Sequence, residues 1–188
     1  MPTLLNFTKF ARKIKMKLSY LFTLLALVGL LSCSKDATSV NNDELIARQD
    51  AIIIQYFREN NIQNFQKHST GFYYTFSKTT TASKATLGDS LSVNYTGNVL
   101  YGKVFDSNLN YAVYKPFNFR YLREKSDPKT SPPLVAFQDA AALLAKGERG
   151  LFYFPSRLLY GSSTANNPIL YPNAILVFDI EMLDVFKQ

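Results

Sequence analysis

The sequence predicts an α+β domain, in which a mainly antiparallel, five-stranded twisted sheet wraps around one short helix and is preceded by one N-terminal helix. Three observations point to this class. The chain of 188 residues is 14% aromatic, with 15 Phe and 12 Tyr, and such residues favour strands. Its hydrophobic fraction of 47% is typical of a chain that folds. From Gly71 onward, apolar and polar residues alternate with a period of two.

Residues 1–32 have the three parts of an export signal. Five Lys and Arg residues and no acid precede the apolar run Leu18–Leu31, which carries no charge. This run is too short to span a hydrocarbon core of about 30 Å as a helix. It ends in Leu-Leu-Ser-Cys, which resembles the lipobox of bacterial lipoproteins, whose Cys receives diacylglycerol. The sequence therefore predicts a lipoprotein signal peptide and a lipidated Cys33, and both Met1 and Met16 are compatible with it as the first residue.

Residues 33–42 follow as a small, polar stretch that predicts a flexible tether between the lipidated Cys and the domain. Residues 43–66 predict a helix and a linker, since Asn42 is a good helix start and acids occupy the first turn. A helix of about four turns is marginal alone, so we expect it to pack on the domain; pairing with a second copy is the alternative, and the oligomeric state stays open. Its apolar stripe consists of Leu45, Ile46, Ile52, Ile53, Tyr56 and Phe57.

Alternating apolar and polar residues predict the five strands of the sheet. These segments are residues 72–77, 91–96, 117–121, 151–155 and 174–183. A short helix is expected between the third and fourth strands, with Phe137 on its buried face. Lys146 then falls in the last helical turn, and Gly147 is placed to end the helix in a left-handed conformation.

Three blocks in this region resemble the FKBP-type peptidyl-prolyl cis-trans isomerases, in the order typical of that family. The first block is GDSLSVNYTG at 88–97 with GKVFDS at 102–107, the second is LVAF at 134–137 with GER at 147–149 and FPSRLLYG at 154–161, and the third is YPNAILVFDIE at 171–181. Together they extend over about residues 70–186. The resemblance implies an FKBP-like isomerase domain at 70–188 and rotamase activity on X-Pro bonds.

The residue types present in the chain are compatible with isomerisation of X-Pro bonds. Amide resonance gives an X-Pro bond a rotational barrier of about 18–20 kcal/mol, which an apolar pocket lowers by holding the twisted amide better than the planar one. No bond to the substrate is needed. With His68 as the single His and Cys33 as the single Cys, the chain lacks a Ser-His or Cys-His pair, a His/Cys zinc site and an internal disulfide. We expect no cofactor and no metal.

The resemblance places a proline pocket on nine residues. Phe137 is its floor, Asp106 lies at its rim, and Tyr160 directs its hydroxyl to a substrate carbonyl. A backbone amide near Leu134 donates to another carbonyl. Ordinary core packing is the alternative for each apolar residue taken singly. The full set is Tyr95, Phe105, Asp106, Phe117, Leu134, Phe137, Tyr160, Leu170 and Phe178.

The charge distribution bears on possible partners. The formal net charge is +7, but five of the 21 Lys and Arg residues and none of the 14 acids lie in residues 1–32. The remainder is nearly balanced, which excludes nucleic-acid binding by bulk charge. The expected partners are proline-containing polypeptides and, through the lipid anchor, a membrane.

The expected function is that of a membrane-anchored folding helper in the cell envelope, facing the periplasm or the cell surface, which isomerises X-Pro bonds of exported proteins. The alternative is a weakly active or inactive FKBP-like binding, chaperone or scaffold lipoprotein. Two departures from the family keep this alternative open. Phe137 stands where Trp is often found, and residues 120–133 form a longer loop than in the commonest short members. The sequence identifies neither the client proteins nor the membrane leaflet.

Overall fold

The computed structural model describes residues 42–110, 114–123 and 134–188. The predicted signal peptide, Cys33 and the tether up to residue 41 lie outside the described residues. So does the inserted loop beyond Arg123, up to residue 133.

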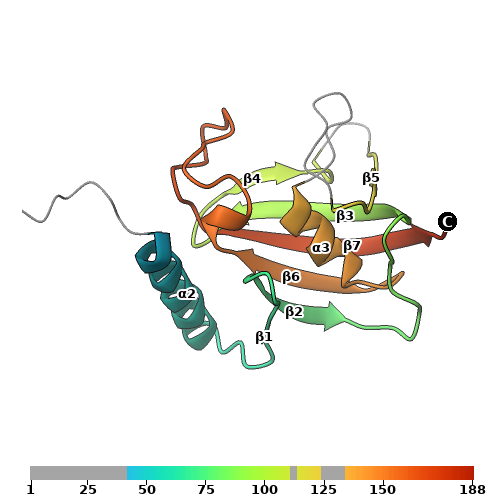
Figure 1. Ribbon diagram of the computed structural model, residues 1–188, viewed down its shortest axis with the longest axis horizontal. Helices are drawn as coiled ribbons and strands as arrows, with labels where there is room; N and C mark the ends of the chain where they lie inside the picture. The colour runs from blue at the N-terminus through green and yellow to red at the C-terminus, as the bar shows by residue number, and fades with distance from the viewer. Residues whose placement is uncertain (1–41, 111–113, 124–133) are drawn as a thin grey trace, which may run out of the picture. The chain divides into compact units, whose positions relative to one another are not determined.

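Seven strands in the described part of the chain form one antiparallel sheet (Figure 1). Their order is β1-β2-β6-β7-β3-β4, while β5 also pairs with β3. The long central pair β3 and β7 joins the two halves of the sheet, and β4 and β5 pair with successive parts of β3. The strands are β1 (Gln66–Lys67), β2 (Tyr73–Lys78), β3 (Ser90–Val99), β4 (Val104–Ser107), β5 (Phe117–Arg120), β6 (Arg149–Phe154) and β7 (Leu176–Phe186). The expected α+β class is confirmed.

The sheet has two strands more than the sequence predicts. All five expected strands are present, and β1 and β4 are the additions. β1 has two residues, too few for a period of two to be recognised, and β4 has the sequence Val-Phe-Asp-Ser, which does not alternate between apolar and polar residues. Pairing with longer strands defines them: Gln66 is opposite Tyr74, and Asp106 is opposite Gly97.

Two α-helices lie in the described part of the chain, α2 (Asn42–Glu59) and α3 (Val135–Ala142). The prediction that α3 continues to Lys146 is wrong. The Ala145 N–H donates to the Glu148 side chain at 2.8 Å, and the Gly147 N–H donates to the Met182 carbonyl at 2.8 Å. These bonds place Lys146 and Gly147 in a turn that leads into β6. Gly147 does have a positive φ of 81°, but it serves that turn rather than the helix end.

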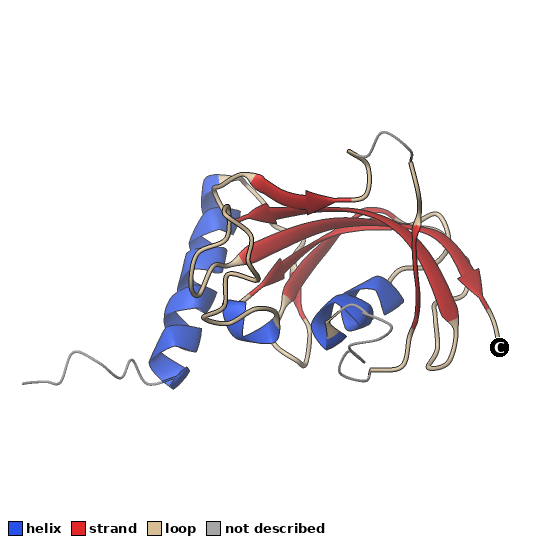
Figure 2. Ribbon diagram, turned by 90° about the horizontal axis from the view of Figure 1, so that it is seen from above, coloured by secondary structure: helices blue, strands red, loops and turns tan. Residues whose placement is uncertain are grey.

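The two helices pack on opposite faces of the sheet. Helix α3 lies on the concave side, where it closes the main hydrophobic core (Figure 2). Helix α2 buries Ile53 and Phe57 against Tyr73 and Tyr153, residues whose side chains point to the other face because strand residues alternate. The helix therefore packs on the domain, as expected. The main core includes Phe72, Leu91, Val93, Phe137, Phe152, Phe154, Phe178 and Ile180.

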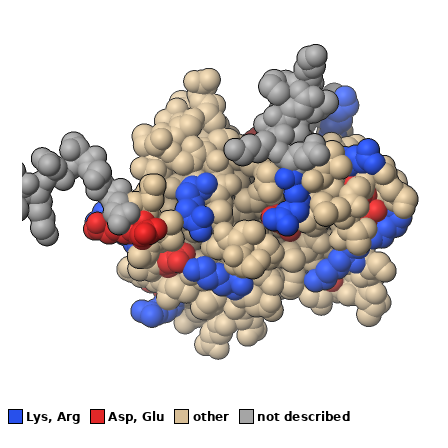
Figure 3. All heavy atoms as spheres, in the orientation of Figure 1, with Lys and Arg blue, Asp and Glu red and all other residues tan. Residues whose placement is uncertain are grey.

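Charged side chains are dispersed over the face shown in Figure 3, where Lys and Arg do not gather in one patch. Elsewhere in the described part of the chain, basic residues form salt bridges with acids from other elements, such as Arg149 with Asp179 at 2.6 Å and Lys146 with Asp184 at 2.9 Å. Among the helices of the described residues, none is both long enough and apolar enough to cross a bilayer.

Candidate active site

A cavity of about 120 Å³ opens beside the N-terminus of α3. This volume is well above the roughly 10–15 Å³ that one water needs, so the cavity has room for a small side chain. Its walls come from β3, β4, β5, β7, α3 and the segment after β6. The lining residues are Tyr95, Asp106, Phe117, Leu134, Phe137, Leu159, Tyr160 and Phe178.

Seven of the nine residues that the sequence singles out line this cavity. The other two lie outside its lining. Phe105 packs its ring against Phe178 at 5.5 Å and Tyr160 at 6.4 Å, and Leu170 is buried in the main core. Leu159 also lines the cavity; it was not predicted from the sequence, although it directly precedes Tyr160. The catalytic role of each residue stays a prediction.

Phe137 forms the centre of the aromatic wall. Its ring centroid is 5.5 Å from that of Tyr95, 5.2 Å from Phe178 and 6.2 Å from Phe117, each in an edge-to-face arrangement. Such pairs are favourable beyond their buried area, and they fix the rings in place. All four rings also belong to the main core or pack against it. Core packing and pocket lining are therefore compatible roles for the same side chains.

Gly97 on β3 makes room for two of these rings. A Cβ atom at this position would lie 2.8 Å from the Phe105 ring and 2.9 Å from the Phe178 ring, closer than real contacts allow. Only glycine lets both aromatic side chains approach the strand here.

The polar rim is built on Asp106. The Tyr95 hydroxyl donates to the Asp106 carboxylate at 2.8 Å, which orients both groups. Asn108, two residues further on, is buried and fixes the end of β4: it accepts from the Tyr95 N–H at 2.8 Å and donates to the Val93 carbonyl at 3.2 Å. Asn108, directly after the end of β4, thus supports the rim, and the sequence did not identify it.

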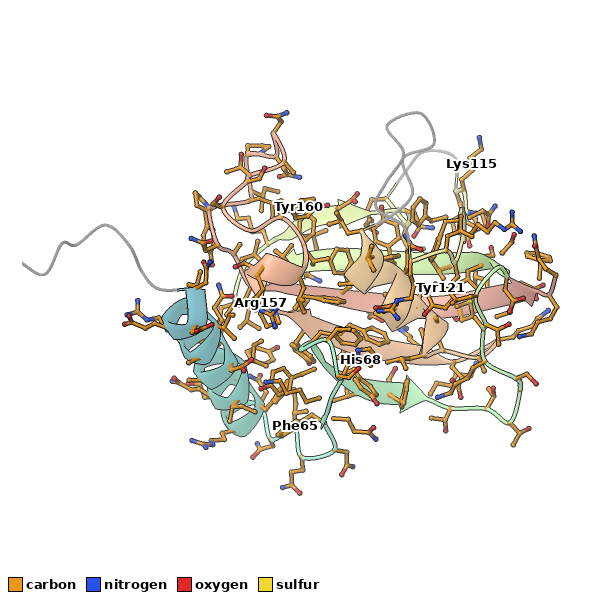
Figure 4. The ribbon with its side chains drawn as sticks, in the orientation of Figure 1. Phe65, His68, Lys115, Tyr121, Arg157 and Tyr160 are labelled. Carbon is orange, nitrogen blue, oxygen red and sulfur yellow. The ribbon has the colours of Figure 1, made fainter. Side chains whose placement is uncertain are left out.

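Tyr160 lies between the 3-10 turn Ser156–Leu158 and the edge of the sheet (Figure 4). Burial, with a smaller effect of the Asp106 carboxylate, raises the pKa of the Tyr160 hydroxyl. The hydroxyl therefore stays protonated, and able to donate a hydrogen bond, throughout the neutral pH range.

Helix α3 begins at the cavity, since Leu134 is both its N-cap residue and part of the lining. The N–H groups in the first turn of a helix have no partner within the helix, and the N-cap residue Leu134 forms no side-chain hydrogen bond with them. The helix therefore presents its N–H end to the cavity. The site thus combines aromatic walls with a few fixed polar groups.

A sheet curved around one short helix, with such an aromatic cavity at the helix N-terminus, defines the FKBP class of domains. Residues 81–183 match the family model for FKBP-type peptidyl-prolyl cis-trans isomerases. The chain belongs to this family of FKBP-type peptidyl-prolyl cis-trans isomerases.

Named relatives share this domain. FK506-binding protein 2 of Candida glabrata is 32% identical over 106 residues, which is 56% of this chain and 71% of the relative. The isomerase FkpA of Aeromonas hydrophila is 29% identical over 121 residues, or 63% of this chain and 39% of FkpA. The isomerase Mip of Coxiella burnetii is 28% identical over 123 residues, or 64% and 47%. The matched region is thus less than half of either bacterial relative.

Solved structures show the same fold. A peptidyl-prolyl cis-trans isomerase of Pseudomonas syringae pv. tomato superposes with a TM-score of 0.59 at 20% identity, over 80% of this chain and all of that one. FkpA of Escherichia coli gives a TM-score of 0.57 at 24% identity, over 93% of this chain and 72% of that one.

Proposed function

We propose that the chain is a membrane-anchored folding helper that isomerises X-Pro bonds of exported proteins, and that the reaction takes place in the cavity beside α3. The observation that carries this proposal is the composition of the cavity. Aromatic side chains form its walls, and Asp106 and Tyr160 place two polar groups among them. This arrangement suits a reaction in which no bond to the substrate is made.

The proposed mechanism uses solvation and hydrogen bonding alone. The substrate proline ring enters against Phe137, and the aromatic walls remove water from the amide, which favours the twisted state over the more polar planar one. Tyr160 donates to a substrate carbonyl, and an N–H group near Leu134 donates to another. The bond between Tyr95 and Asp106 holds the rim in place.

Replacing Tyr160 tests the assignment of the site. We expect the full chain, purified in detergent, to accelerate isomerisation of a leucyl-prolyl tetrapeptide in a protease-coupled assay. Tyr160→Phe and Asp106→Ala should each lower kcat/KM about two- to tenfold, the range for one lost hydrogen bond, with a nearly unchanged melting temperature. Because the pKa of Tyr160 is raised, the wild-type rate should be constant from about pH 6 to about pH 9.

Tyr171→Phe is the matched control. Tyr171 is an exposed tyrosine that follows Tyr160 in the same loop and does not line the cavity. Tyr171→Phe removes a hydroxyl as Tyr160→Phe does, but its isomerisation rate should equal that of wild type. If wild type shows no acceleration, the enzymatic proposal fails. If wild type is active and both site variants match it, the assignment of the cavity fails while the family membership stands.

A binding module with little turnover is the second candidate. The observation that favours it is the floor of the cavity, where Phe137 offers a smaller surface to a proline ring than the Trp often found in the family. This candidate requires that a proline peptide binds, as measured by chemical-shift changes of Tyr160, while the isomerisation rate stays at the uncatalysed value.

We infer that Cys33 anchors the protein in the cell envelope. The support is the apolar run that ends at Leu-Leu-Ser-Cys, together with the polar stretch that separates this residue from the start of α2 at Asn42. Each buried methylene of an acyl chain contributes about 0.8 kcal/mol, so two or three chains on one residue hold the domain firmly at the membrane.

Cys33→Ala should release the protein from the membrane fraction or leave the precursor uncleaved. Cell fractionation followed by immunoblotting measures both outcomes. Ser39→Ala, a change within the predicted tether, is the control and should remain in the membrane fraction at the processed size. A Cys33→Ala variant that is also found there at that size would refute the anchor. Protease treatment of intact cells then distinguishes a periplasm-facing protein from one at the cell surface.

A further inference from the structure

Gln49 is a buried polar residue on the apolar face of α2, with 4% of its surface exposed. Both its amide nitrogen and its amide oxygen form hydrogen bonds with residues more than a hundred positions later in the chain. The Nε2 group donates to the Asn173 carbonyl at 2.8 Å and to the Ser156 hydroxyl at 3.0 Å. Its Oε1 atom accepts from the Ser156 N–H at 2.9 Å.

Ser156 and Asn173 are the two ends of one segment, which we call the pocket loop (residues 156–173). This loop carries Leu159 and Tyr160, two of the residues that line the cavity. Gly161, inside the loop, forms a hydrogen bond with each end. Its N–H donates to the Ser156 carbonyl at 2.8 Å, and its carbonyl accepts from the Asn173 N–H at 2.8 Å. Gln49 thus completes the closure of the loop at its base.

The conformation at one end of the loop requires support. Asn173 has a φ of 61°, in the left-handed region that side chains other than glycine seldom adopt. The carbonyl of this same residue accepts the hydrogen bond from Gln49. The other end is the short 3-10 turn that starts at Ser156 and ends at Leu158, and Leu159 and Tyr160 follow it.

We propose that Gln49 is a positioning residue for the isomerase reaction, which makes α2 part of the machinery that shapes the cavity. This inference rests on the proposed active site. Gln49 does not touch the cavity. It fixes both ends of the pocket loop, and the loop in turn fixes where Leu159 and Tyr160 stand. Without the amide, the Ser156 N–H and the Asn173 carbonyl lose a buried partner, and the loop base is free to shift.

A shift of this kind affects catalysis more than its size suggests, because misplacement by about 1 Å lowers the rate steeply. The tip of the loop, around Asn167, is held by a separate hydrogen bond. The Asn167 side chain donates to the Phe105 carbonyl on β4 at 2.9 Å. Loss of Gln49 should therefore displace the base of the loop, where Tyr160 lies, while the tip remains attached to β4.

The test compares Gln49→Ala and Ser156→Ala with a matched control, all in the full chain purified in detergent. The control is Tyr101→Phe, which removes the hydroxyl that bonds to Glu59 near the other end of α2. Two quantities are measured well below the melting temperature: kcat/KM on the proline tetrapeptide, and the amide NMR shifts of Leu159, Tyr160 and Gly161.

Gln49→Ala should lower kcat/KM at least about threefold and shift the three loop amides. Ser156→Ala keeps the hydrogen bond from the Ser156 N–H to Gln49, so it should change both quantities in the same direction but by less. If Gln49→Ala does not fold, the result for Ser156→Ala tests the inference in its place. Tyr101→Phe should alter neither quantity. Wild-type kcat/KM and unshifted loop amides in the folded Gln49 variant would overturn the inference. If wild type itself is inactive, the proposed function fails, and the NMR shifts alone decide whether Gln49 holds the loop.

Discussion

Phe178→Ala is expected to lower the free energy of unfolding by about 3–5 kcal/mol, the usual range for deleting a buried phenylalanine ring. Phe178 lies near the start of β7 with 5% of its surface exposed. Its ring packs against those of Phe105, Phe137 and Phe154 at 5.2–5.9 Å, so its removal leaves a cavity among these rings.

The same change should also reduce isomerase activity more strongly than the loss of folded protein explains. Phe178 lines the cavity, so its removal takes away a wall that excludes water from the substrate amide. Thermal unfolding measured by circular dichroism gives the stability, and kcat/KM normalised to the folded fraction gives the activity.

Phe186→Ala provides the matched control on the same strand. Phe186 is 56% exposed, so its replacement should change stability by no more than about 0.5 kcal/mol and leave activity unaltered. A Phe178→Ala variant with the same melting temperature as wild type would mean that this ring is not part of the core. One that is destabilised but fully active would remove Phe178 from the proposed site.

Patterns that repeat along the chain could be predicted from the sequence. The five predicted strands alternate over four or more residues, and each alternation reflects one face in the core and one outside it. The cavity could be predicted through the family resemblance, because its residues lie in motifs of fixed spacing. Tyr95, Asp106 and Tyr160 are examples: each comes from a different element, and the fold brings them to one cavity.

Features that depend on distant partners could not be predicted in this way. β1 and β4 are strands because longer strands pair with them, and α3 ends early because Glu148 and Met182 bind the backbone after it. Gln49 is the clearest example. A lone amide on a helix resembles any exposed polar residue, and only the folded chain shows that its partners are Ser156 and Asn173.

Phe57→Ala should destabilise the protein as much as Phe178→Ala, by about 3–5 kcal/mol, and yet spare the activity of the folded molecules. Phe57 is 1% exposed on α2. Its ring stacks on Phe65 at 4.5 Å and meets the Tyr153 ring edge-to-face at 4.7 Å. These contacts belong to the cluster on the face of the sheet opposite the cavity, so the cavity walls keep their own neighbours.

The measurement again pairs thermal unfolding with kcat/KM normalised to the folded fraction, with Gln55→Ala as the control. Gln55 is exposed one half-turn earlier on α2, and its loss should shift stability by no more than about 0.5 kcal/mol. An unchanged melting temperature for Phe57→Ala would contradict the packing of α2 on the sheet. Activity that falls further than the folded fraction would show that the whole of α2, and not Gln49 alone, holds the pocket loop. Activity within about twofold of wild type would restrict that role to the end of the helix where Gln49 bonds to Ser156 and Asn173.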